Sequence, residues 1–193
     1  MKIAVALHRD SDAPARALVL PAIAGSAAFG AAIGSFVGGR QILYAAIKMP
    51  IFLFGTLAVC AALFAILTPR AIATAVRTIF TTTMVLGALA PPIFLAGVSL
   101  PKPAAYSHMV LILTAAVAIA GAWSVARLKA ALPSTGLWLA WIAIYAFVGA
   151  QMGWLLKPWV GYTMVADRFI PLSQNLRGNF YEAAWGTLLN VVR

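Results

Sequence analysis

The stretch YAFVGAQMGWLLKPWVG, residues 145–161, runs from an apolar segment into a Lys-Pro-Trp junction. Gln151 stands between Gly149 and Gly153, in a run so apolar that water is not expected around it. A side-chain amide without hydrogen-bond partners costs several kcal/mol in such surroundings. The stretch therefore predicts a membrane helix in which the two glycines allow close packing and Gln151 bonds across to a neighbouring helix.

The composition of the whole chain agrees with a lipid environment, because 63% of its 193 residues are hydrophobic and only 9% are charged. In soluble domains about a quarter of the residues are charged. Five apolar segments are each close to the roughly 20 residues that cross a bilayer. They lie at about 18–38, 49–68, 78–98, 106–126 and 136–156. The expected fold is an all-α integral membrane bundle of about five transmembrane helices.

The bundle is expected to occupy residues 18–156, between an N-terminal segment, 1–17, and a C-terminal tail, 157–193. Residues 40–48 are expected to form a short interfacial helix before the second span. Pro91 and Pro92 are expected to kink the third span or end its helical part, because proline removes a helix hydrogen bond. Whether the glycine-rich first segment fully spans the membrane or re-enters it stays open.

The net charge of +10 comes from basic residues scattered singly among the loops. Such a pattern favours contact with anionic lipid head groups over nucleic-acid binding, which needs a dense basic patch. Lys48 and Lys157 are expected at the membrane interface, where lysine can extend its ammonium toward the head groups. Tryptophan prefers the same level. The residues expected there as anchors are Trp138, Trp141, Trp154 and Trp159.

The first apolar segment carries a small residue at every fourth position, Ser26, Gly30, Gly34 and Gly38. In a helix these positions form one flat face, which lets another backbone approach closely. The partner helix is expected within the same chain, although a helix of another subunit is the open alternative.

The end of the tail, about 179–193, has the spacing of an amphipathic helix. Asn179 and Glu182 stand in the positions of a capping box. The apolar face, expected to lie on the membrane surface or to dock on a partner, consists of Phe180, Ala184, Trp185, Leu188 and Val192.

Groups for catalysis are sparse. The four carboxylates lie outside the apolar segments, and the lone Cys60 lies inside one. No nucleophile–base set, phosphate-binding loop or metal-ligand spacing can be assembled from these residues. No catalytic residue, metal site or cofactor is therefore expected, and the chain is not expected to be an enzyme.

Three stretches, GGRQILYAAIKMPIFLFGTL (38–57), FVGAQMGWLLKPWVG (147–161) and GNFYEAAW (178–185), together resemble a group of bacterial multi-pass membrane proteins. Some of these proteins are identified as similar to the Yip family of five-span membrane proteins. The resemblance implies five spans. For the Yip family it also implies membrane trafficking and organisation through protein partners.

The function expected is that of a non-enzymatic accessory, scaffolding or assembly subunit of a larger membrane complex in the bacterial inner membrane. Its expected partners are membrane lipids and other membrane-protein subunits, and not nucleic acid. The alternative is a small oligomeric channel or permease with a polar path near Gln151.

Overall fold

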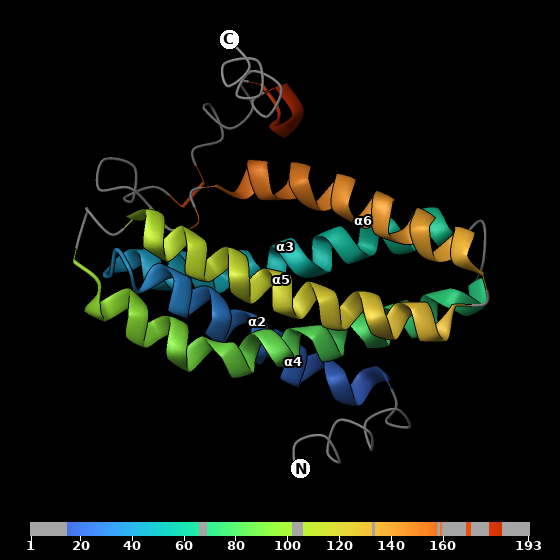
Figure 1. Ribbon diagram of the computed structural model, residues 1–193, viewed down its shortest axis with the longest axis horizontal. Helices are drawn as coiled ribbons and strands as arrows, with labels where there is room; N and C mark the ends of the chain where they lie inside the picture. The colour runs from blue at the N-terminus through green and yellow to red at the C-terminus, as the bar shows by residue number, and fades with distance from the viewer. Residues whose placement is uncertain are drawn as a thin grey trace.

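The computed structural model describes residues 15–65, 69–101, 106–132, 134–157, 159, 169–170 and 178–182. Five long helices account for most of these residues (Figure 1). They are α2 (Ala15–Gly34), α3 (Arg40–Ala65), α4 (Pro69–Ser99), α5 (Tyr106–Ala131) and α6 (Thr135–Leu156). Each is long and apolar enough to cross a membrane, and no strand occurs in the described ranges. The predicted all-α bundle with five candidate membrane spans is confirmed.

Successive helices run in opposite directions along the bundle (Figure 1). At one end, called the tail end below, α2, α4 and α6 finish and α3 and α5 begin, and the C-terminal segment follows α6 there. At the opposite end Ser134 caps α6, because its hydroxyl oxygen accepts a hydrogen bond from the Leu137 amide at 3.2 Å.

Helix α2 lies against α3 through the glycine face predicted from the sequence. A Cβ atom on Gly30 would overlap the main-chain carbonyl of Ala45, and one on Gly34 would overlap the carbonyl of Gln41. Ser26 is fully buried, and its hydroxyl donates to the Ile23 carbonyl of its own helix at 2.9 Å. Close backbone approach through small residues is how helices associate in lipid. For Gly30 and Gly34 the partner helix is internal.

A second face of α2 crosses α4 in the same manner. A Cβ atom on Gly87 would lie 2.7 Å from the Cα atom of Gly25, and one on Gly97 would overlap the Ser35 hydroxyl. This face was not predicted. With α3 on one side and α4 on another, α2 is the central helix of the bundle.

Helices α5 and α6 each pack mainly against one other helix of the bundle. Helix α5 packs on α4 and α6 packs on α3, while α5 and α6 contact each other little (Figure 1). Near the opposite end the Trp138 indole N–H donates to the Val125 carbonyl at 3.2 Å and joins the two helices. From there toward the tail end, residues of α5 and α6 line two cavities, which form a cleft between the helices.

The expected short helix over residues 40–48 is not separate from the second span. Helix α3 runs without a break from Arg40 to Ala65 and contains Pro50. The prediction was wrong because it treated Lys48 as a marker of the membrane interface, whereas the helix buries that side chain completely.

The proline pair does not end the third span. Helix α4 continues through Pro91 and Pro92 to Ser99. Both prolines are exposed on the outside of the bundle. Their rings therefore do not disturb the packing against α2.

Gly38 does not belong to the packing face of α2. The helix ends at Gly34, and Gly38 and Gly39 adopt positive φ angles of 83° and 56° in the turn before α3. No atom lies within 4 Å of a Cβ placed on Gly38. Its role is to permit a left-handed turn, which glycine adopts without steric cost.

Candidate functional site

The three stretches that carry the sequence resemblance meet at the tail end. They correspond to the first half of α3, the end of α6 and the segment around residues 178–182. Because this end gathers buried polar groups, aromatic rings and a cavity, it is the candidate functional site.

The residue that follows α6 is fastened to the start of α3. The Gln41 side-chain N–H group donates to the Trp159 carbonyl at 3.0 Å, and Gln41 is only 1% exposed. The Trp159 indole N–H donates back to the Gly153 carbonyl at 3.0 Å, and its ring meets Phe52 edge-on at 5.4 Å. The chain after α6 is thereby held against α3.

Lys48 does not lie at a lipid-facing surface, and its predicted role as an interface contact is wrong. Its side chain is 0% exposed, and its Nζ atom lies 5.5 Å from the centre of the Phe169 ring. Phe169 also meets Tyr44 edge-on at 5.4 Å. A cation over an aromatic face is attracted by the ring quadrupole. Phe169, from the segment after α6, therefore covers part of Lys48.

Gln41 and Tyr44 were missed as site residues. The signal was present, since Gln41, Tyr44 and Lys48 stand at positions i, i+3 and i+7 and share one face of a helix. A polar face on an otherwise apolar membrane helix indicates that another part of the protein covers it.

Gln151 has a different partner from the one expected. Its side-chain oxygen accepts a hydrogen bond from the Phe180 amide at 3.4 Å, so it bonds to the C-terminal segment and not to a neighbouring long helix. The prediction that the Gln151 amide has a hydrogen-bond partner is confirmed. The prediction that a neighbouring long helix provides this partner is wrong, because the C-terminal segment provides it.

The segment 178–182 begins a helical turn, which is fixed on α6. The Asn179 side-chain oxygen accepts from the Glu182 amide at 2.9 Å, so the predicted N-cap is confirmed. The Tyr181 hydroxyl donates to the Phe147 carbonyl, and the two rings stack at 4.7 Å. Of the predicted docking face, Phe180 is described and is 40% exposed, and the others, Ala184, Trp185, Leu188 and Val192, lie outside the described residues.

Gly149 and Gly153 do not bring two backbones together. A Cβ on Gly149 would lie 3.7 Å from the Thr56 methyl group, and one on Gly153 would lie 3.8 Å from Phe52. These are ordinary contacts with side chains. The close packing predicted for this pair is therefore wrong, and both glycines line a cavity instead.

Thr56 is fully buried, and its hydroxyl has no hydrogen-bond partner among the described residues. Replacing Thr56 with valine is expected to raise the free energy of unfolding by about 1 kcal/mol, because a helix released from the bundle lets this hydroxyl bond its own backbone.

The matched control is Thr83→Val, since the buried Thr83 hydroxyl already donates to the Phe80 carbonyl at 2.7 Å. Unfolding in mixed detergent micelles measures both variants. A Thr56 variant no more stable than the parent protein would contradict the prediction.

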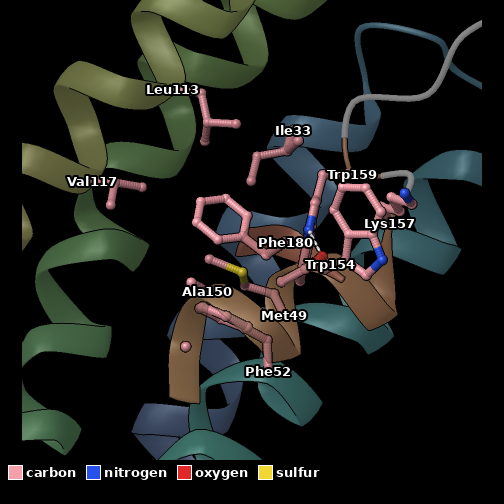
Figure 2. Close-up of a pocket in the computed structure, with 12 residues that line it drawn as sticks. Ile33, Met49, Phe52, Leu113, Val117, Ala150, Trp154, Lys157, Trp159 and Phe180 are labelled. Atoms are coloured by element: carbon pink, nitrogen blue, oxygen red, sulfur yellow. Dashed lines mark hydrogen bonds between the residues drawn. The ribbon is translucent and has the colours of Figure 1, made fainter. Parts of the chain in front are cut away.

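A cavity of about 390 Å³ lies between α3, α5, α6 and Phe180 (Figure 2). Apolar side chains such as Met49, Leu113 and Val117 line it, and Trp154, Lys157 and Trp159 gather at one end (Figure 2). A second cavity of about 250 Å³ lies farther along the same cleft. Gln151 lines neither cavity.

Lys157 directly follows α6 and lies on an aromatic face. Its Nζ atom is 3.0 Å from the centre of the Trp154 ring. Burial lowers the pKa of the Lys157 ammonium from its ordinary value, because desolvation disfavours the charged form. An anion beside Lys157 would oppose this shift.

The predicted tryptophan anchors divide into two groups. Trp141 is only 3% exposed and packs on Phe64 at 4.7 Å, so its predicted place among the head groups is wrong. Its ring faces α3 in the interior. Trp138, Trp154 and Trp159 are partly exposed, and Lys129 stacks on Trp138 at 5.5 Å.

No family model, curated protein or solved structure matches this chain. The resemblance to Yip-like bacterial proteins stays a prediction. Among the described residues, no group of three or more His, Cys, Asp and Glu side chains lies close enough to hold a metal ion.

Proposed function

We propose that the protein is a non-enzymatic subunit of a larger assembly in the bacterial inner membrane, which binds its partner through the C-terminal helix. One observation supports this above the others. The described residues at the start of that predicted helix, 178–182, are fixed on α6 by the hydrogen bonds of Gln151 and Tyr181, and the Asn179 side chain caps the turn.

The hydrogen bond from the Phe180 amide to Gln151 is informative because an amide side chain in an apolar helix is costly. Here the Gln151 side chain accepts from the Phe180 amide and so holds the C-terminal segment on α6. Fixing a binding element before the partner arrives lowers the conformational entropy lost on binding. Gln151 therefore serves to present the tail.

The exposed apolar surface of this segment suits a protein partner. Phe180 is 40% exposed where the helical turn begins, and Trp185 and Leu188 follow on the predicted face. Aromatic residues such as tryptophan dominate the binding energy of many interfaces.

The test is purification of the tagged full chain from its own membrane in mild detergent, followed by sizing and mass spectrometry. A defined partner in fixed stoichiometry is expected. Leu188→Arg should lower recovery of that partner at least about tenfold, because truncating a central contact costs about 2 kcal/mol or more. Asn190→Arg adds the same charge on the opposite face of the helix and should leave recovery unchanged.

Two outcomes would overturn the proposal. One is a lone species of one to a few copies of this chain. The other is a partner that both arginine variants retain equally, since the tail helix would then not be the binding element.

A further inference from the structure

The two cavities of the bundle are parts of one cleft between α5 and α6. Both are lined by Met49, Phe52 and Val117, so they adjoin. The cleft begins beside Lys157 at the tail end and continues to Trp141 and Leu128 near the opposite end. At that end the hydrogen bond from the Trp138 indole N–H to the carbonyl of Val125, which also lines the second cavity, joins α5 to α6.

The size of the first cavity suits a hydrocarbon chain. On α6 the cavity extends from Gly149 to Lys157, about 12 Å along the helix axis. Its volume is about 390 Å³, and its lining is almost entirely apolar. The first cavity is therefore wide and apolar enough to hold an acyl chain.

The depth of the first cavity also fits a lipid. About 12 Å along α6 compares with about 15 Å for the hydrocarbon half-thickness of a bilayer. A molecule with its head group at Lys157 would extend its chain past Gly149, and the second cavity would receive the remainder.

The charge at the mouth selects the head group. Lys157 is the one charged residue among the described residues that line either cavity. Trp154 and Trp159 beside it have the indole rings that prefer the head-group level of a membrane. A lysine ammonium at this level complements a negatively charged phosphate.

We propose that the cleft between α5 and α6 binds one anionic phospholipid, with its phosphate beside Lys157 and an acyl chain in the two cavities. This lipid belongs to the bundle itself and does not depend on the protein partner proposed above. The site takes the lipid laterally from the membrane, since the cleft opens between two helices that contact each other little.

Native mass spectrometry of the purified full chain in micelles tests the proposal. Phosphatidylglycerol and phosphatidylcholine with the same acyl chains are titrated in turn. One phosphatidylglycerol is expected to bind in preference to phosphatidylcholine. Lys157→Gln should weaken phosphatidylglycerol about fivefold, the factor that corresponds to about 1 kcal/mol for a basic residue near an anionic surface. Lys129→Gln, at the opposite end and also stacked on a tryptophan, should leave binding unchanged.

Val117→Trp should block the chain site, since Val117 lines both cavities and is 47% exposed. Ile119→Trp, at a 57% exposed position of the same helix that lines neither cavity, is its control. Gly121→Leu is a second blocking variant, because Gly121 lines the second cavity. No atom lies within 4 Å of a Cβ there, so the bundle tolerates the added side chain.

Equal binding of the two lipids would overturn the proposal, as would equal effects of Val117→Trp and Ile119→Trp. Either result would mean that lipids contact only the general surface of the bundle. Because this experiment needs no partner protein, its failure is distinguishable from failure of the proposed function.

Discussion

Replacing Gly30 with valine is expected to lower the free energy of unfolding by about 3 kcal/mol, the upper end of the usual cost of overpacking. A Cβ on Gly30 would overlap the Ala45 carbonyl oxygen and lie 2.9 Å from the Met49 Cβ. The carbonyl belongs to the backbone of α3, so no side-chain rotation relieves the clash. The added branch at Cβ makes the overlap worse, and α2 must move away from α3.

Detergent-induced unfolding followed by circular dichroism measures this effect. Gly136→Val is the matched control, because no atom lies within 4 Å of a Cβ on Gly136. A loss for Gly30→Val that differs from the control by less than about 0.5 kcal/mol, the usual range for surface substitutions, would refute the proposed contact.

Trp141→Ala is expected to cost about 3 kcal/mol, the lower end of the range for deleting a large buried aromatic side chain. The lower end applies because an unfolded helix in lipid keeps its side chains out of water, so mainly the cost of the empty cavity remains. Trp141 is 3% exposed and contacts Phe64 from α3. Its removal also weakens the packing of α6 on α3, the helix that α6 contacts most.

The control for this prediction is Trp154→Ala, measured by the same unfolding experiment. Trp154 is partly exposed and carries Lys157 on its face, an interaction worth about 0.5–2 kcal/mol. Equal losses for the two variants would show that Trp141 acts at the membrane interface, as the sequence predicted, and not in the core.

The number of spans could be predicted because a lipid environment makes the length of each apolar run the dominant signal. The start of α3 could not. Lys48 marks an interface when judged from its neighbours in sequence, but the side chain is buried under Phe169, about 120 positions later in the chain. No pattern in the sequence around Lys48 predicts that a residue so far along the chain covers it.

For Gln151, the need for a hydrogen bond could be predicted from the sequence, but its partner could not. Its amide had to be satisfied in an apolar helix, and the structure satisfies it. The identity of the donor, the Phe180 amide, depends on how the chain turns after Lys157, which periodicity does not specify. For the glycines, too, one close contact could be predicted from the sequence and another could not. The face of α2 with Gly30 and Gly34 has a regular spacing, whereas the crossing of Gly25 with Gly87 needs knowledge of which helices meet.

The central position of α2 has a consequence for biogenesis. The ribosome delivers this helix to the membrane before the other four, and it is the one with close-packing partners on two faces. Until α3 and α4 have been inserted, Gly25, Gly30 and Gly34 lack the backbones against which they pack. Assembly of the core therefore waits for α4, although α2 is the first of the five helices to be synthesised. Helices α5 and α6 can then join a core that is already formed.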